Sequence, residues 1–276
     1  MNLADPSALK AFLARHDLMA SKGLGQHFLV SQKVVSAIVA AFDGSRGMLE
    51  IGPGPGVLTS LLSERADKMI AIELDERMIA ALTDSSPKAE VLKADALKIS
   101  LTEILERLPE PRGVVSNLPY YITGPLLTKI AEVSHLYSKA VLMMQREVAD
   151  RVVAAPKTSA RGSLSVYLQL QFDIRLVVQA PGGAFMPPPK VDSSVLEFTP
   201  KPLPVPKDQE KDLFRLVRTG FTQPRKTLAN NLVAAWAVDR ETALKWILAL
   251  GLKETARPQE LSNAEWVELH RARLSD

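Results

Sequence analysis

Residues 49–59 read LEIGPGPGVLT, and this stretch decides the fold. A short apolar run typical of a buried strand leads into Gly52, Gly54 and Gly56, and a helix-forming sequence follows. Glycines allow a backbone to turn sharply and to pass close to a ligand, and the first turn of a helix adds partial positive charge. A dinucleotide-binding loop needs its third glycine five residues after the first, where this chain has Val57. The pattern therefore predicts a ligand-binding turn and disfavours nicotinamide and flavin cofactors.

Strand and helix patterns alternate after this turn at intervals of about 20 residues. Such alternation predicts an α/β fold, with a mostly parallel sheet wrapped by helices. The expected strands of that sheet are residues 48–51, 68–74, 89–95, 112–117 and 139–145. Two further strand candidates, 166–178 and 193–198, follow each other without a clear helix between them. They predict an antiparallel pair at the edge of the sheet.

The chain is expected to form two domains. Residues 1–45 carry helical patterns and form an N-terminal extension of the α/β domain, which spans residues 1–200. The proline-rich stretch PKPLPVPK at 200–207 predicts a linker. Residues 208–276 show only helical spacing of apolar side chains and predict a small all-α domain.

Composition excludes several classes of protein. The 276 residues are 46% hydrophobic and include no cysteine, which rules out disulfides and thiolate metal sites. The four histidines are scattered and none has metal-ligand spacing, so no metal is expected. The chain has no run of 18 apolar residues and no secretory pattern at its N-terminus. We therefore expect a cytoplasmic protein with no membrane partner, and a monomer.

Two acidic residues end expected strands. Glu73 lies about 20 residues after Gly52, where a carboxylate accepts hydrogen bonds from both ribose hydroxyls of an adenosine cofactor. Asp95 ends the next strand and is placed to accept a hydrogen bond from an adenine amine. Either acid alone is more often a turn or cap residue. Together with the glycine turn, in this order, they predict an adenosine-containing cofactor at the carboxyl ends of the strands.

Residues 117–120, NLPY, end the fourth expected strand and suit chemistry on an adenine amine. The lone pair of that amine is delocalised into the ring, so two acceptors must hold its hydrogens and make nitrogen more tetrahedral. We expect the Asn117 side-chain oxygen to accept one hydrogen and the Pro119 carbonyl to accept the other. Tyr120 offers a face on which a flipped base stacks. Without the sheet around it, this sequence would be an ordinary strand-end turn.

The order of these features resembles the class I, Rossmann-like methyltransferases, whose cofactor is S-adenosyl-L-methionine. The resemblance implies that the three glycines line the methionine end of the cofactor, Glu73 the ribose and Asp95 the adenine. It becomes more specific in six motifs: LGQHFL (24–29), EIGPGPGVLT (50–59), IELD (72–75), NLPYYIT (117–123), MMQREVADR (143–151) and FMPPPKVDS (185–193). From about residue 24 to 198 the chain is similar to the small-subunit rRNA adenine dimethyltransferases.

That family resemblance implies an activity and a substrate. The expected reaction is dimethylation of two adjacent adenosines in a hairpin near the 3′ end of small-subunit rRNA, linked to ribosome biogenesis. The expected partner is that rRNA in the immature 30S subunit. The resemblance also implies that Leu29, Leu74, Ala96, Asn117 and the backbone of His27 border the cofactor, and that Phe185 stacks on the target base opposite Tyr120. His27 stands where the family usually has asparagine.

RNA binding is expected to depend on exposed cations. The whole excess of positive charge lies in residues 201–276, which hold 13 Lys and Arg against 10 Asp and Glu. A solvated helix face would explain such a run as well. We expect phosphate contacts from Lys22, Lys33, Arg218, Arg225 and Lys226.

Two other functions fit the same motifs. An erythromycin-resistance methyltransferase resembles this chain and modifies an adenine of large-subunit rRNA, although the PPPKVDS stretch and the leucine of NLPY favour the small subunit. A ribosome-assembly factor without turnover is the non-enzymatic alternative. The intact residues Asn117 to Tyr120 favour catalysis over that alternative.

Overall fold

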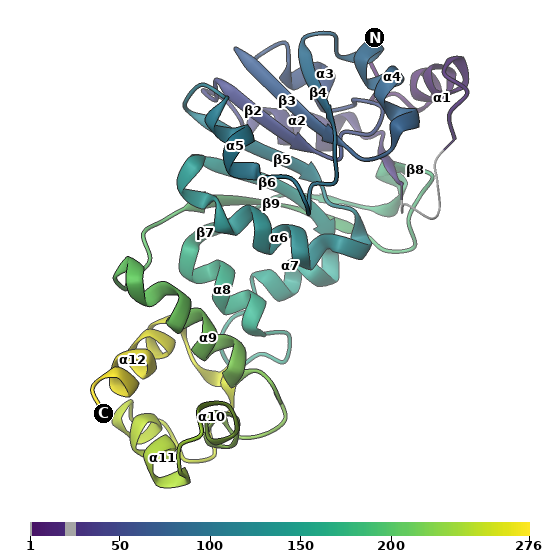
Figure 1. Ribbon diagram of the computed structural model, residues 1–276. Coiled ribbons are helices and arrows are strands. Elements are labelled where there is room, and N and C mark those ends of the chain that lie inside the picture. Colours follow the sequence, from purple (N-terminus) through teal and green to yellow (C-terminus); the bar gives the residue numbers. More distant parts are fainter. Residues whose placement is uncertain (1, 20–25) are drawn as a thin grey trace. The chain divides into compact units, whose positions relative to one another are not determined.

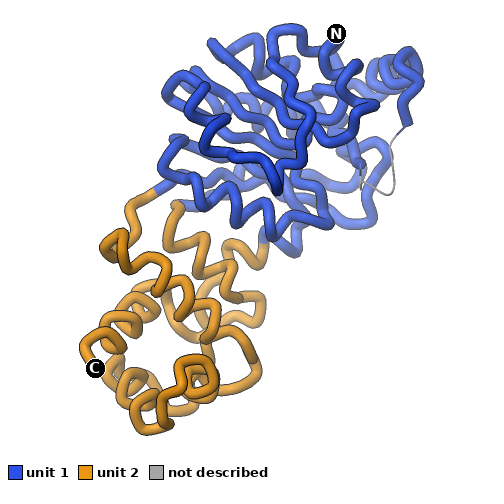
Figure 2. Tube along the Cα trace, in the orientation of Figure 1, with its two compact units in different colours: residues 1–149, 173–200 blue, residues 150–172, 201–276 orange. Residues whose placement is uncertain are grey.

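The computed structural model describes residues 2–19 and 26–276, and the chain divides into two compact units (Figures 1 and 2). The first unit comprises Met1–Ala149 and Asp173–Pro200. The second comprises Asp150–Phe172 and Lys201–Asp276. The expected division near residue 200 assigned 150–172 to the α/β domain, and the structure instead groups that segment with the C-terminal helices.

A seven-stranded sheet forms the centre of the first unit (Figure 1). Its strands are β2 (Gly47–Ile51), β3 (Lys68–Glu73), β4 (Ala89–Lys93), β5 (Arg112–Asn117), β6 (Lys139–Gln145), β7 (Phe172–Ala180) and β9 (Ser193–Pro200). Their order across the sheet is β4–β3–β2–β5–β6–β9–β7. Strands β2 to β6 pair in parallel, and β9 pairs with β6 in antiparallel orientation. The predicted parallel sheet with an antiparallel edge is therefore confirmed.

Strand β2 lies where the strand order reverses. The next strands along the chain, β3 and β4, lie on one side of it, and β5 and β6 lie on the other. Because crossovers between parallel strands are right-handed, the connections on the two sides pass over opposite faces of the sheet. A crevice therefore opens at the carboxyl ends of β2 and β5, where open α/β sheets bind ligands.

Helices cover the sheet, and some of them begin at a side chain that caps the first turn. The helices of this unit are α1 (Pro6–Arg15), α2 (Gln32–Ala40), α3 (Thr59–Leu62), α4 (Glu76–Ser85), α5 (Leu101–Glu106) and α6 (Thr123–Glu132), and α7 (Arg146–Val152) crosses into the second unit. The Asp5 carboxylate accepts the Ala8 N–H at the start of α1, and Asp75 accepts the Arg77 N–H at the start of α4. These side chains satisfy backbone donors that the first turn leaves free.

A two-stranded antiparallel sheet joins the N-terminal segment to the segment after β7. Its strands are β1 (Phe28–Leu29) and β8 (Phe185–Met186), with Phe28 opposite Met186 and Leu29 opposite Phe185. The Val30 N–H donates to the Ala184 carbonyl, 2.7 Å away, and extends this pairing. The pairing brings residues 28–29 of the LGQHFL motif next to the FMPPPK motif, which is about 160 residues away in sequence.

One predicted strand is partly wrong. Residues 163–171 form helix α8 (Ser163–Gln171), and strand β7 begins only at Phe172. The alternation of Val166, Leu168 and Leu170 with polar residues is typical of a strand. All three are buried, and because a helix covered on several sides shows no single apolar stripe, the spacing was misleading.

The second unit is helical, as residues 208–276 predicted. Its helices are α8, α9 (Glu210–Gly220), α10 (Leu228–Trp236), α11 (Arg240–Ala249) and α12 (Asn263–Leu274). Val166 and Leu170 of α8 pack in one core with Leu213, Leu228 and Trp266. This shared core explains why the segment 150–172 belongs to this unit. Among the described residues, no helix is long and apolar enough to cross a membrane.

A buried arginine links the segment before α8 to the start of α12. Arg161 is 3% exposed, and its guanidinium donates to the carbonyl oxygens of Ala154 (2.9 Å) and Leu261 (3.1 Å). It also donates to the side-chain oxygens of Gln169 and Asn263. Burial lowers the pKa of Arg161, but these acceptors on several elements compensate the charge.

Replacing Arg161 by methionine is expected to destabilise the second unit by on the order of 3 kcal/mol, because buried acceptors lose their donor. All three tryptophans, Trp236, Trp246 and Trp266, lie in this unit, so urea unfolding followed by tryptophan fluorescence reports on it selectively. The matched control is Arg271→Met, whose ion pair with Glu268 lies on the surface and is expected to be worth at most about 1 kcal/mol. Equal losses for the two variants would contradict the structural role of Arg161.

Candidate active site

The glycine turn after β2 uses its glycines for two different purposes. Gly52 has φ +70°, and a Cβ atom there would meet nothing within 4 Å, so its backbone borders open space in the crevice. Gly56 has φ +92°, and a Cβ atom there would overlap the Ser85 hydroxyl of α4. Gly52 and Gly54 line the pocket, whereas Gly56 does not. The close approach of Gly56 to α4 gives this glycine a packing role, while its expected contact with the cofactor stays a prediction.

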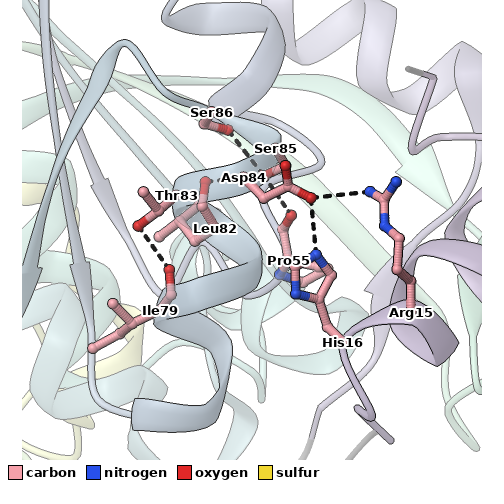
Figure 3. Close-up of polar contacts among 9 residues, drawn as sticks. All are labelled: Arg15, His16, Pro55, Ile79, Leu82, Thr83, Asp84, Ser85 and Ser86. Atoms are coloured by element: carbon pink, nitrogen blue, oxygen red, sulfur yellow. Dashed lines mark hydrogen bonds and ion pairs between the residues drawn. The ribbon is translucent and has the colours of Figure 1, made fainter.

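Helix α4 holds the back of this turn (Figure 3). The Ser85 hydroxyl lies 2.9 Å from the Pro55 carbonyl and donates to it. The neighbouring Asp84 carboxylate bonds Arg15 Nη2 at 3.0 Å and His16 Nε2 at 2.9 Å, at the end of α1. The turn is thus supported from the side of α4, and its other side remains open to the pocket.

Glu73 lies at the carboxyl end of β3 and faces the pocket as predicted. It is 7% exposed, and its two oxygens accept the N–H groups of Gly54 (3.0 Å) and Asp75 (2.8 Å). Burial raises the pKa of Glu73, while these backbone donors oppose the shift. Each carboxylate oxygen has a second lone pair, so Glu73 retains capacity to accept hydroxyl groups of a ligand.

Glu50 also lines the pocket, and the sequence analysis missed it. It is 2% exposed in the middle of β2, and its carboxyl group accepts the Thr59 hydroxyl at 2.6 Å. Burial raises the pKa of Glu50 to about 8. The signal for Glu50 in the sequence is a charged residue inside an otherwise apolar strand.

Asp95 borders the pocket beyond β4. Its Oδ1 accepts the Leu97 N–H at 2.9 Å, and its Oδ2 lies 3.6 Å from the Lys98 ammonium. The carboxylate thus also shapes its own turn, which is the ordinary role of such a residue. The structure brings the other expected cofactor neighbours to the same pocket, namely His27, Leu29, Leu74 and Ala96.

Asn117 ends β5, next to β2, and its amide is oriented by the backbone of His27. The Asn117 Nδ2 donates to the His27 carbonyl at 3.2 Å. Because a carbonyl only accepts hydrogen bonds, the NH₂ end of the amide must face His27. The Asn117 Oδ1 is therefore the end that remains free as an acceptor, as the expected chemistry requires.

The Pro119 carbonyl is less available for the acceptor role expected of it, because it already has neighbouring donors. It accepts the Ile122 N–H at 3.1 Å, and the Thr123 hydroxyl, whose single hydrogen is shared with the Tyr120 carbonyl at 3.3 Å, lies 3.1 Å from it. In the described part of the chain the Leu118 carbonyl has no hydrogen-bond donor, and Leu118 lines the pocket. These contacts favour the Leu118 carbonyl over the Pro119 carbonyl as the acceptor that acts beside the Asn117 Oδ1.

Tyr120 lines the pocket, and its hydroxyl group is hydrogen-bonded. The Tyr120 hydroxyl and the Ser193 hydroxyl lie 2.9 Å apart, and burial raises the pKa of Tyr120. The next residue, Tyr121, also lines the pocket and is 58% exposed. Phe185 is 3% exposed and packs in the apolar core of this unit, so its ring offers little exposed surface for the expected stacking on a base. Its pairing opposite Leu29 in the small sheet places it there.

These residues surround one pocket at the predicted edge of the sheet. The space between the lining atoms, including the open mouth, is about 1070 Å³. Beside the residues already described, Gln26, Pro53, Asp75 and Leu126 contribute to its lining. In residues 2–19 and 26–276, no group of three or more potential metal ligands gathers at this pocket or elsewhere.

Four of the five cations expected to contact RNA lie on the surface of the described structure. Lys33 is exposed on α2, and Arg218, Arg225 and Lys226 are exposed at and after the end of α9. Within the described residues none of these four cations has an ion-pair partner. Lys22 lies outside the described residues.

Comparison with known proteins agrees with this geometry. A family model described as ribosomal RNA adenine dimethylase matches residues 18–271. A ribosomal RNA small subunit methyltransferase A from Streptococcus equi subsp. zooepidemicus is 40% identical over 274 residues, which cover 95% of this chain and 94% of the relative. The protein with the same description from Streptococcus pneumoniae is 38% identical over 281 residues, with 98% and 97% covered.

Solved structures show the same fold. A dimethyladenosine transferase from Plasmodium falciparum matches with a TM-score of 0.71 and 26% identity, covering 88% of this chain and 96% of that one. The 23S rRNA methyltransferase ErmE matches with a TM-score of 0.68 and 24% identity, covering 89% and 98%. The match of the family model to nearly the whole chain is the decisive finding. This protein belongs to the ribosomal RNA adenine dimethylase family.

Proposed function

We propose that this protein dimethylates the exocyclic amines of two adjacent adenosines in a hairpin near the 3′ end of small-subunit rRNA, and so takes part in ribosome biogenesis. The methyl donor is S-adenosyl-L-methionine. The observation that carries the proposal is the free Asn117 Oδ1, oriented by the His27 carbonyl in a pocket that also holds Glu73. The curated relatives at 38–40% identity are described as acting on the small subunit, which supports this choice of rRNA.

The residues of the pocket fit the cofactor. At Gly52 the backbone is bare toward open space, and Glu73 and Glu50 are buried carboxyl groups that border it. Glu73 is placed to accept hydroxyl groups of the ribose, and Asp95 to accept the amine of the adenine. When bound, S-adenosyl-L-methionine supplies an electrophilic methyl group on a positively charged sulfur.

The residues that end β5 suit the target amine. The Asn117 Oδ1 and the Leu118 carbonyl accept its two hydrogens and draw the nitrogen out of conjugation with the ring. Tyr120 and the exposed Tyr121 offer aromatic faces to a base that has left its stack. No strong base is required, because the nitrogen becomes acidic only after it has gained the methyl group. Positioning supplies most of the rate.

Several features support the finer parts of the proposal. The unpaired cations Arg218, Arg225 and Lys226 suit the phosphates of an RNA duplex in the immature 30S subunit. We propose a monomer acting in the cytoplasm, where ribosomal subunits assemble, since every lining residue of the pocket comes from one unit of one chain. The similarity to ErmE at 24% identity shows a shared fold only and does not favour the large subunit.

Mass spectrometry of rRNA fragments tests the proposal directly. Immature 30S subunits and naked large-subunit rRNA are incubated with the protein and isotopically labelled cofactor. We expect two labelled methyl groups on each of two adjacent adenosines near the 3′ end of the small-subunit rRNA. Label on large-subunit rRNA alone would favour the erythromycin-resistance activity, and assembly without label would favour the non-enzymatic factor.

Asn117→Ala is expected to lower kcat for methyl transfer by roughly 10²- to 10³-fold, the loss typical of removing one oriented hydrogen-bond partner in an active site. Because the side chain is assigned to the target amine, the Kd for the cofactor is expected to stay within about twofold of wild type. Single-turnover kinetics measures the first quantity and calorimetric titration the second. A parallel loss of cofactor affinity and rate would contradict this assignment.

Glu50→Gln is expected to change how stability depends on pH. Folded Glu50 keeps its proton up to about pH 8, whereas the unfolded chain loses it near the ordinary pKa of 4.5. Between these values the folded state binds more protons, so this group lowers the free energy of unfolding as pH rises. Calorimetric unfolding of the cofactor-free protein from pH 5 to 9 should show a Tm difference that grows in favour of the glutamine variant up to about pH 8.

The control for that measurement is Glu103→Gln, at an exposed position of α5. Its Tm curve is expected to run parallel to that of wild type across the whole pH range. A Glu50→Gln curve that also runs parallel to wild type would show that Glu50 is already ionised in the folded protein at pH 5.

Arg225→Glu is expected to weaken binding of the rRNA hairpin and to reduce the slope of log K against log salt by about 1, because one phosphate contact is lost. Filter binding at several salt concentrations measures both quantities. Arg65→Glu makes the same change in net charge in the first unit, where Arg65 pairs with Asp43, and should leave the slope unchanged. Equal effects of the two variants would indicate that only net charge matters.

A further inference from the structure

His27 contacts the segment that follows β5 and the segment that follows β8, although the motif that contains it is expected to border the cofactor. Its ring stacks on the Tyr120 ring, with centroids 5.8 Å apart and planes 25° apart. Its Nδ1 lies 2.8 Å from the Pro187 carbonyl. Its own carbonyl accepts the Asn117 amide. One residue is thus joined to two segments that are distant in sequence, residues 117–120 and the segment that contains Pro187.

The pairing of β1 with β8 explains this position. Phe28 lies opposite Met186 in that antiparallel pair, so continuing the register by one residue places His27 opposite Pro187. Proline has no N–H to offer across the ladder, so its carbonyl is the group available to a side chain. The imidazole of His27 donates to that carbonyl through Nδ1.

The Pro187 contact determines which nitrogen of His27 carries a proton. A carbonyl oxygen only accepts, so the Nδ1 must be protonated, and the neutral ring has its lone pair on Nε2. The Nδ1–H donates in the neutral and in the charged imidazole alike. The link between His27 and Pro187 therefore does not depend on the ionisation of the ring.

The Tyr120 ring is held from two sides by these contacts. Its hydroxyl is paired with the Ser193 hydroxyl of β9, and its face is stacked by His27. His27 is itself fixed by Pro187. Removing the imidazole would leave Tyr120 anchored at one end only and free to change its ring orientation.

We propose that the His27 side chain is a positioning residue for the target base and not a ligand of the cofactor. It fixes the ring of Tyr120 and the segment that follows β8 in the arrangement that receives an adenine. This role rests on the proposed function, because it assigns a further residue to the same reaction. The backbone of His27 keeps its separate contact with Asn117 when the side chain is changed.

The first measurement does not require activity. The protein contains four tyrosines, and labelling them with 3-fluorotyrosine gives ¹⁹F NMR signals that Tyr→Phe variants assign. In His27→Ala we expect the Tyr120 signal to move and the signals of Tyr137 and Tyr167 to stay, which also shows that the fold is intact. An unmoved Tyr120 signal would overturn the proposal.

The second measurement separates substrate positioning from cofactor binding. His27→Ala is expected to lower kcat/KM for the RNA roughly tenfold through the lost stacking and hydrogen bond, with a cofactor Kd within about twofold of wild type. In a Tyr120→Ala background the same change is expected to have less than about a twofold effect, because neighbours that act together are not additive. His135→Ala, at an exposed histidine, is the matched control and should resemble wild type.

Two results would refute the role. A cofactor Kd that weakens as much as kcat/KM falls would make His27 a cofactor ligand. A full tenfold loss in the Tyr120→Ala background would show that His27 acts independently of Tyr120. If wild type itself left the adenosines unmethylated, the proposed function would fail instead, and the NMR result would still decide whether His27 positions Tyr120.

Discussion

The reversal of strand order at β2 is the constraint on which the rest of the structure depends. Because the right-handed crossovers that follow β2 and β5 pass over opposite faces of the sheet, a crevice opens at the carboxyl ends of these two strands. The pocket residues proposed to bind the cofactor come from the ends of β2, β3 and β4, and the acceptors proposed for the amine come from the end of β5. Adjacent parallel strands thus bring the two halves of a transfer reaction to a common crevice.

Orientation within that crevice comes from groups that have only one way to bond. Carbonyl oxygens accept and never donate, so the His27 carbonyl fixes the direction of the Asn117 amide. The Pro119 carbonyl accepts the Ile122 N–H and shares the Thr123 hydroxyl hydrogen with the Tyr120 carbonyl, so it is a poorer acceptor than the Leu118 carbonyl. The proposed acceptors of the target amine, the Asn117 Oδ1 and the Leu118 carbonyl, do not titrate. This agrees with chemistry that depends on position more than on proton transfer.

The segment 26–29 links the two sides of the pocket. Gln26 donates to Asp75 beyond β3 at 3.0 Å, and residue 27 reaches Asn117 and Pro187. Short strands β1 and β8 would be weak alone, and the burial of Phe28 and Phe185 in the core of the unit secures them. Phe185, which was expected to stack on a base, thereby stabilises the pairing of β1 with β8.

The sequence by itself determined the α/β class, the parallel sheet with its antiparallel edge, the helical C-terminal region and the strand-end positions of Glu73, Asp95 and Asn117. These follow from periodicity and from the order of motifs, which are local properties of the chain. Tertiary structure alone decided that Gly56 packs against Ser85 and that Phe185 is buried. It also decided that 150–172 joins the helical unit and that burial raises the pKa of Glu50 to about 8. Each of these depends on which distant residues surround a side chain, and spacing along the sequence does not contain that information.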